Sequence, residues 1–188
     1  DIANNFYSIP TSKIAYEFTR KVYKLLELNI NNIEQNYTSY ELIGENEIIM
    51  EEELNINGTN MKFDAIIGNP PYQIKDGGSN RSSKPIYQHF IQQAKLLNPK
   101  HIVIITPSRW FVGGKGLDSF RKEMLEDKQI RKIVDFRNAN EVFPDVDIAG
   151  GVSFFHWEKD TNGKTIVVNF DNGQIDEQER YLNDHHIF

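Results

Sequence analysis

The chain has 188 residues and a mass of 21.8 kDa, with 39% hydrophobic and 26% charged residues, which excludes a wholly disordered protein and suits about one domain. It contains no cysteine, no apolar run near the ~20 residues that cross a bilayer and no visible signal peptide, so we expect a cytoplasmic protein without disulfides or zinc–cysteine sites. The net charge is −6, but residues 61–140 carry 14 basic and 7 acidic side chains between acidic flanks, a pattern typical either of contact with a polyanion or of solvated faces.

The first 60 residues predict a short strand, a helix, a loop and a second strand. Residues 5–10 read as a strand that a proline ends, and the two hydroxyl residues after it suit the N-cap of a helix. Apolar residues recur at helical spacing over residues 13–28, which predicts an amphipathic helix. The polar residues 29–46 read as loop, and the apolar centre of residues 47–52 predicts a buried strand that ends in acids.

From residue 62 the sequence alternates between apolar runs of strand length and amphipathic helices. The predicted elements, in order, are a strand at 62–68, a polar loop at 73–84, a helix at 85–97, a strand at 101–106, a helix at 116–127, and strands at 130–136, 151–157 and 165–170. The last two strands read as an antiparallel pair around a hairpin-type turn at 160–163. This order predicts a doubly wound, mostly parallel α/β sheet with an antiparallel hairpin at one edge.

The motif Asn69-Pro70-Pro71-Tyr72 follows the first strong strand. In an open α/β sheet, ligands bind beyond the carboxyl ends of the strands, which is where this motif lies. The Asn69 side-chain carbonyl and the Pro70 backbone carbonyl can accept the two N–H groups of a ring-conjugated amine, on a backbone that two prolines stiffen. Two fixed acceptors favour the positive charge that develops when such an amine attacks a methyl donor, and Tyr72 offers a flat ring for stacking. The alternative is a tight turn capped by Asn69.

These residues carry a resemblance to a known family. The segment Phe63–Gln73, FDAIIGNPPYQ, resembles the catalytic motif of gamma-class N6-adenine DNA methyltransferases of restriction–modification systems, and looks most like a type IIG-like methyltransferase region. The resemblance covers roughly residues 5–160 and includes Ile105–Trp110 and the segment at 141–152. It implies a Rossmann-like methyltransferase fold, S-adenosylmethionine as cofactor, double-stranded DNA as partner, and a fused or separate restriction or target-recognition domain in a bacterial cytoplasm.

The resemblance implies a role for each residue that matches the motif. Asn69, Pro70, Pro71 and Tyr72 become the catalytic residues that hold an adenine flipped out of the duplex. Phe143 covers the other edge of that base, unless it is a core residue before a turn. No metal site is expected. The loops that flank the motif supply candidate DNA contacts, each of which alone is more typical of a solvated charge: Arg81, Lys84, Arg109 and Lys115.

The expected binding site of the methyl donor, S-adenosylmethionine, departs from the family pattern. The family binds S-adenosylmethionine with an F-x-G-x-G loop after its first strand, but the first glycine of this chain is Gly44. Residues 5–28 resemble the second strand and its helix, although Pro10 follows where an acid usually contacts the ribose. Glu52 takes the position of an acid near the cofactor adenine, with its two acidic neighbours as competitors. We therefore expect a fragment that lacks the first strand and the glycine loop, with an incomplete donor site.

The domain and function hypotheses follow from this reading. We expect residues 1–160 to form a partial methyltransferase catalytic domain, and residues 161–188 a C-terminal hairpin or extension toward a target-recognition region. The leading hypothesis is methyl transfer from S-adenosylmethionine to the N6 amine of a flipped adenine, with this chain inactive alone. Two alternatives stay open: a protein glutamine-N5 or RNA methyltransferase that uses the same motif, and a non-catalytic module that binds DNA or a partner in a restriction complex.

Overall fold

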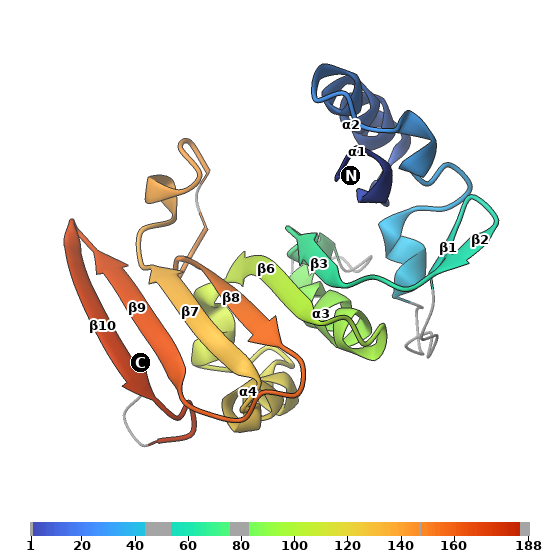
Figure 1. Ribbon diagram of the computed structural model, residues 1–188. Coiled ribbons are helices and arrows are strands. Elements are labelled where there is room, and N and C mark those ends of the chain that lie inside the picture. The colour runs from blue at the N-terminus through green and yellow to red at the C-terminus, as the bar shows by residue number, and fades with distance from the viewer. Residues whose placement is uncertain (1, 44–53, 76–82, 147, 185–188) are drawn as a thin grey trace. The chain divides into compact units, whose positions relative to one another are not determined.

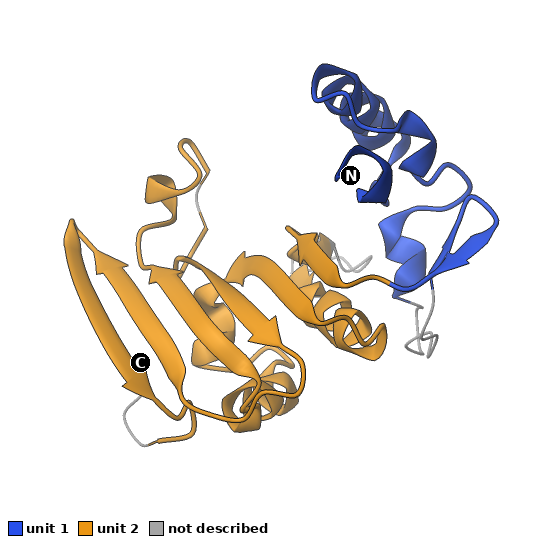
Figure 2. Ribbon diagram, in the orientation of Figure 1, with its two compact units in different colours: residues 1–62 blue, residues 63–188 orange. Residues whose placement is uncertain are grey.

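Two compact units make up the chain, residues 1–62 and residues 63–188 (Figure 2). The computed structural model (Figure 1) describes the following parts of them: residues 2–43, 54–75, 83–146 and 148–184. Within these ranges no helix is both long and apolar enough to cross a membrane. The strand expected at residues 47–52, with Glu52, lies outside the described residues.

The first unit consists of short helices and one small hairpin. Helix α2 (Lys13–Leu25) begins at a hydroxyl cap as predicted, since Ser12 Oγ accepts a hydrogen bond from the Ala15 N–H over 3.1 Å. It ends before the predicted residue 28, and Glu27 takes a left-handed φ of 56°. The other elements of this unit are α1 (Ile2–Asn5), η1 (Ile30–Asn32), η2 (Ser39–Leu42), β1 (Leu54–Ile56) and β2 (Thr59–Met61).

The strand predicted over residues 5–10 is wrong. Only Ser8 forms a bridge, to Ile33, and its side chain is hydrogen-bonded to the Tyr23 hydroxyl over 2.7 Å. Pro10 has no N–H to donate to a ladder, so the segment cannot extend the pairing. The unit is held together instead by the buried Glu34 carboxylate, which accepts hydrogen bonds from the Asn36 and Asn57 N–H groups, each over 2.6 Å.

The second unit is a six-stranded sheet with two helices. The strands β3 (Ala65–Gly68), β6 (His101–Pro107) and β7 (Ile130–Phe136) and the helices α3 (Tyr87–Leu96) and α4 (Asp118–Glu126) lie where the sequence predicts them. The remaining elements are β4 (Gln73–Lys75), β5 (Ser83–Pro85), η3 (Ser108–Phe111), η4 (Ala139–Glu141), β8 (Val152–Glu158), β9 (Thr165–Asp171) and β10 (Gln174–Arg180).

The strand order of the sheet is β10-β9-β7-β8-β6-β3. Four of the six strands run in one direction and only β8 and β10 run against them, which confirms a mostly parallel α/β sheet with an antiparallel hairpin at one edge. The predicted pairing of residues 151–157 with 165–170 is wrong, because β7 lies between β8 and β9 (Figure 1). The edge hairpin is formed by β9 and β10, and β8 is inserted between β6 and β7.

The core lies between one face of this sheet and the two helices. Ile104, Phe155, Ile133 and Val167 stand in register on adjacent strands and are all buried. They belong to one cluster with apolar side chains of α3 and α4, which places both helices on this face. The four strands that run in the same direction, β3, β6, β7 and β9, end on the same side of the sheet. The candidate site lies at these ends.

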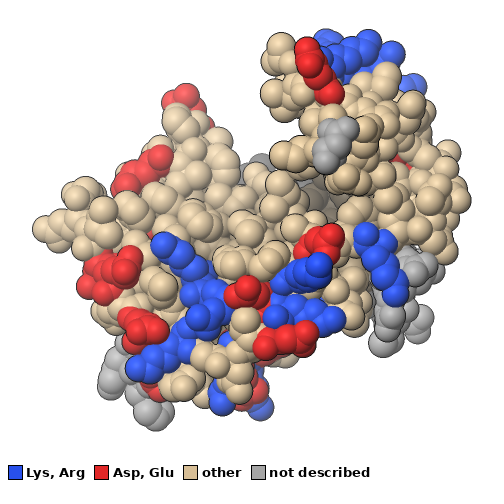
Figure 3. All heavy atoms as spheres, viewed as in Figure 1, with Lys and Arg blue, Asp and Glu red and all other residues tan. Residues whose placement is uncertain are grey.

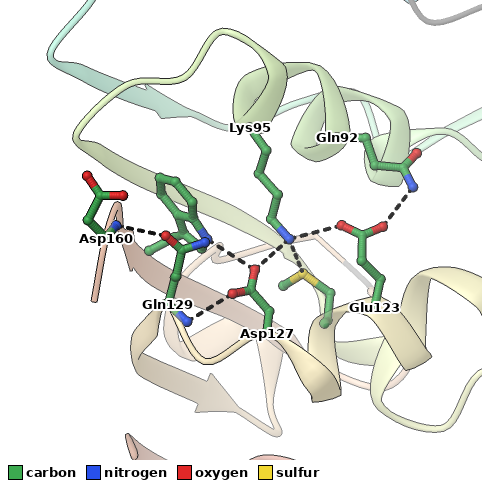
Figure 4. A network of polar contacts seen from close by, with 8 residues as sticks. Gln92, Lys95, Glu123, Asp127, Gln129 and Asp160 are labelled. Carbon is green, nitrogen blue, oxygen red and sulfur yellow. Dashed lines mark hydrogen bonds and ion pairs between the residues drawn. The ribbon is translucent and has the colours of Figure 1, made fainter. Parts of the chain in front are cut away.

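A polar network ties α3 to α4 and to the sheet (Figure 4). The Lys95 Nζ lies 3.0 Å from Glu123 Oε1 and 2.8 Å from Asp127 Oδ2, and the Lys95 side chain is only 16% exposed. Asp127 also accepts hydrogen bonds from the Trp157 indole over 3.0 Å and from the Gln129 N–H over 2.9 Å. These bonds pair the charges of Lys95, Glu123 and Asp127 in a partly buried environment. The network therefore fixes the positions of α3 and α4 on the sheet.

Candidate functional site

The motif Asn69–Tyr72 begins where β3 ends. β3 pairs in parallel with β6, and Gly68, its last residue, stands opposite Ile104. Pro70 and Pro71 have no N–H to continue the ladder, so the chain leaves the sheet at this point. Because β6 runs on to Pro107 in the same direction, the motif and the end of β6 share the carboxyl edge of the sheet.

The chain after the motif folds back on itself. The loop predicted at 73–84 has paired ends: β4 and β5 are antiparallel, with Gln73 opposite Pro85. The Tyr72 carbonyl oxygen then accepts a hydrogen bond from the Ile86 N–H over 3.2 Å, one residue before α3 begins. The motif is thus held by a sheet strand on one side and by a helix start on the other.

The side chains of the motif differ in exposure. Asn69 is exposed, and no described residue forms a hydrogen bond with its amide, so both of its polar atoms are available to a ligand. Tyr72 is half-buried and its ring packs against the core cluster. Its hydroxyl is buried without a hydrogen-bond partner among the described residues, and this burial raises the pKa of Tyr72. The phenol stays neutral at physiological pH, and part of the ring is already used by the core.

A pocket of about 480 Å³ lies at the same edge of the sheet. Its walls come from η3 after β6, from the ends of β7 and β9, and from the loop that precedes β8. The lining residues are Ser108, Arg109, Phe111, Val112, Asp135, Arg137, Ala149, Gly150 and Asn169. The pocket exists because β8 enters between β6 and β7 and brings its preceding loop over their ends.

A buried hydrogen bond forms the floor of this pocket. The Ser108 hydroxyl donates to Asp135 Oδ1, and both residues are about 95% buried or more. Burial raises the pKa of Asp135, while the hydrogen bond from Ser108 and the nearby charge of Arg137 lower it. Burial is the largest of these causes, so the pKa of Asp135 stands above its ordinary value.

The cations around the pocket are not all equivalent. Arg137 Nη1 lies 2.9 Å from Asp171 Oδ2, whereas no described residue forms an ion pair with the exposed Arg109. On the face seen in Figure 3, Lys and Arg side chains lie among Asp and Glu side chains rather than forming an unbroken basic surface. The basic excess of residues 61–140 is therefore not one continuous patch on this face.

The other residues that the sequence singles out are spread over several elements. Of the four candidate DNA contacts, Arg109 lines the pocket, Lys84 is exposed on β5, and Lys115 is exposed after a pair of glycines with a φ of 50°. Arg81 lies outside the described residues. Phe143 is half-buried, and its N–H donates to the Ala139 carbonyl over 2.8 Å just after η4. The structure does not bring Phe143 into the lining of the pocket.

Four pocket residues carry signals that the sequence analysis did not use. Asp135 is a carboxylate near the end of the strand at 130–136, and Asn169 is an amide near the end of the next parallel strand. Ser108 comes two residues after the strand predicted at 101–106, and Arg137 comes directly after the strand predicted at 130–136. A polar side chain at the carboxyl end of a parallel strand is the feature that would have identified them.

Comparisons with known proteins identify the family. The Eco57I restriction-modification methylase family matches residues 4–143. A protein described as an uncharacterized adenine-specific methylase from Mycoplasma pneumoniae is 32% identical over 141 residues, which cover 73% of this chain and 33% of that protein. The chain therefore spans about a third of the length of this curated relative.

A solved structure shares the fold. The methyltransferase subunit of a type I restriction-modification system from Streptococcus thermophilus superposes with a TM-score of 0.58 and 17% identity, over 94% of this chain and 39% of that one. At this identity the likeness establishes the fold alone. It supports the α/β architecture expected from the alternation of strands and helices.

Proposed function

The chain belongs to the Eco57I restriction-modification methylase family, and on this premise we propose that it carries the target-base site of a DNA methyltransferase that acts on the N6 amine of adenine. The observation that carries the proposal is the position of Asn69: an exposed amide directly after a parallel strand, followed by two prolines and a tyrosine. This is the edge of an α/β sheet where ligands bind.

The chemistry assigns a step to each residue of the motif. The adenine amine is a poor nucleophile because its lone pair is delocalised into the ring. The Asn69 side-chain oxygen and the Pro70 carbonyl each accept one of its N–H groups, which favours a pyramidal nitrogen and stabilises the positive charge that develops on it. The adenine must leave the duplex to reach these acceptors, and the Tyr72 ring provides its stacking partner.

The methyl donor of this proposal is S-adenosylmethionine. Residues 1–43 contain no glycine, so they hold no F-x-G-x-G loop of the kind expected to bind this donor. The strand next to the motif is also at the edge of its sheet, with Ile67 63% exposed. We therefore assign no step to the donor.

The same proposal covers the partner of the protein, the roles of its two segments and its location. We propose double-stranded DNA as the partner, residues 1–160 as part of the catalytic domain, and residues 161–188 as an extension toward a target-recognition or restriction part. β9 and β10 of this extension belong to the same sheet as β3. A cytoplasmic location in a bacterium follows from a role on genomic DNA.

The experiment that tests the proposal asks which acceptor receives the methyl group. The gene that encodes this chain is expressed over its whole reading frame, and the product is given labelled S-adenosylmethionine with plasmid DNA and a cell-extract protein fraction as competing acceptors. We expect label in DNA as N6-methyladenine. Label in protein alone would move the assignment to glutamine methylation, and no label in any acceptor would leave a non-catalytic module.

A further inference from the structure

A row of polar side chains crosses the sheet below the pocket. Thr106 on β6 stands opposite Ser153 on β8, Ser153 stands opposite Asp135 on β7, and Asp135 stands opposite Asn169 on β9. Residues directly opposite each other point to the same face of a sheet, so these four share a face. This is the face that carries the apolar core two residues away on each strand.

On each of the four strands, the next residue on this face beyond the buried apolar row is polar. The neighbouring row on this face consists of four buried apolar residues, Ile104, Phe155, Ile133 and Val167. The polar row that follows is also largely buried: Thr106 is 0%, Ser153 2% and Asp135 5% exposed. Two members of this row, Asp135 and Asn169, line the pocket, which indicates a surface shaped for a polar ligand.

The row is not fully satisfied by the protein itself. The Thr106 hydroxyl is buried with no hydrogen-bond partner among the described residues. Asp135 is bonded through Oδ1 to Ser108, and no described residue forms a hydrogen bond with Asp135 Oδ2 or with the Asn169 amide. Asp135 and Asn169 both line the pocket, so these unpaired acceptor atoms favour a ligand that supplies hydrogen-bond donors to them.

The rim of the pocket has the opposite charge to its floor. Arg109 has no ion-pair partner among the described residues, and it lines the pocket together with Arg137, which also pairs with Asp171, and with the apolar side chains of Phe111, Val112 and Ala149. Guanidinium groups suit phosphate, and apolar walls suit the faces of a flat ring. A ligand that fits both parts has an anionic group at one end and a ring with amino donors at the other.

We propose that this pocket binds one nucleotide of the DNA strand other than the target adenine, with its phosphate at Arg109 and Arg137 and the amino group of its base at Asp135 and Asn169. The proposal rests on the proposed function for the source of the nucleotide. A carboxylate accepts hydrogen bonds and donates none, so it selects bases with an exocyclic amino group. Cytosine therefore binds better than uracil, which has a carbonyl oxygen at the same position.

The test measures nucleotide binding directly, without methyl transfer. The 188-residue chain is labelled with ¹⁵N and titrated with deoxycytidine monophosphate, deoxyuridine monophosphate, deoxycytidine and inorganic phosphate, while the backbone and Trp110 indole signals are followed. We expect saturable shifts at residues of the pocket with a Kd of about 1 mM or tighter for deoxycytidine monophosphate. We expect about tenfold weaker binding or worse for the other three ligands, since each lacks one part of the proposed ligand. Deoxyuridine monophosphate lacks the amino group, deoxycytidine lacks the phosphate, and inorganic phosphate lacks the base.

Two variants and a control assign the contacts. Asp135→Asn keeps an acceptor for Ser108 but places an NH₂ group toward the base, and we expect it to remove the preference for cytosine over uracil. Arg109→Gln, at an exposed position, is expected to weaken both nucleotides about equally. Lys122→Gln changes an exposed cation on α4 outside the pocket and should leave binding unchanged.

The outcomes separate this proposal from the proposed function. Equal binding of the cytosine and uracil nucleotides, shifts outside the pocket, or no saturable binding would overturn the nucleotide pocket even if the protein methylates DNA. Selective binding that Asp135→Asn abolishes would support the pocket even if methyl transfer to DNA is not found.

Discussion

The Tyr72 carbonyl oxygen accepts a hydrogen bond from the Ile86 N–H over 3.2 Å, although the intervening chain leaves the sheet and returns through β4 and β5. This bond joins the last residue of the Asn-Pro-Pro-Tyr motif to the residue that caps α3. Since β3 fixes the other end of the motif, Asn69 and Pro70 lie between two anchored points. The backbone of the motif, and with it the Pro70 carbonyl oxygen, is thereby held in place before any substrate binds, which is the condition for electrostatic preorganisation.

Replacement of Tyr72 by Phe should stabilise the protein. The Tyr72 hydroxyl is buried without a partner among the described residues, so its removal relieves a desolvation cost of about 1 kcal/mol. The ring is retained, and we expect methyl transfer to be retained with it. Urea unfolding checks the stability. Tyr23→Phe is the matched control, because that hydroxyl is bonded to Ser8 over 2.7 Å and its loss should destabilise by a similar amount. A loss of stability in both variants would contradict the account.

Replacement of Gly151 by Ala should strongly destabilise the second unit. Gly151 has a φ of 80°, and a Cβ there would overlap the Phe136 carbonyl oxygen and lie 2.9 Å from that of Arg137. Its own carbonyl accepts the hydrogen bond from the Ser108 N–H at the pocket. Gly173 has the same φ with open space around it, so Gly173→Ala should cost only about 1–2 kcal/mol. Thermal unfolding of the two variants should differ clearly, and equal shifts would show that the backbone contact is unimportant.

The alternation of strands and helices in the sequence predicts β3, α3, β6, α4 and β7 well. β3 and β6 have continuous apolar runs, α3 and α4 have a clear helical period, and proline or glycine stands at a boundary of each of these four, so local patterning is enough to define them. The motif after β3 could be placed for the same reason, because a strand end is a local property. The exposure of Asn69 and the partial burial of Tyr72 could not, since they depend on how the core packs around the motif.

The position of β8 could not be predicted from its residues. The apolar segment at 152–158 fits equally well beside any buried strand, and only the tertiary fold inserts it between β6 and β7. The sequence does not predict β10, because its residues are almost all polar and exposed, as an edge strand allows. The pocket was missed as a consequence, because its lining comes from three strand ends and a loop that meet only in this strand order.

Replacement of Lys95 by Met should destabilise the packing of α3 against α4. The variant leaves Asp127 and Glu123 without the cation that lies within 3.0 Å of both (Figure 4). For a partly buried pair we expect a loss of about 1–3 kcal/mol, less than for a fully buried one. Lys122→Met on the exposed face of α4 should change stability by at most about 0.5 kcal/mol. Equal urea midpoints for the two variants would show that the network contributes nothing.

The stability of the protein should depend on pH through Asp135. Burial raises the pKa of this carboxyl in the folded state above its ordinary value of about 4, so the folded protein holds the proton more tightly than the unfolded chain. The free energy of unfolding therefore falls as pH rises from the ordinary pKa through the raised one. Asp135→Asn does not titrate, so its stability relative to wild type should increase as pH rises from about 4 through the raised pKa of Asp135. A pH-independent difference in urea unfolding would contradict this assignment.

Methyl transfer by the Asn69→Ala variant tests the central claim most directly. Asn69 is exposed and none of the described residues is hydrogen-bonded to its amide, so the variant should fold as wild type does. We expect the rate of N6-methyladenine formation in DNA to fall by about 100-fold or more, because one of two fixed acceptors of the amine is removed. Asn162→Ala, in the exposed turn between β8 and β9, should match wild type. Wild-type methylation by the Asn69→Ala variant would contradict the assignment of this motif as the site of methyl transfer.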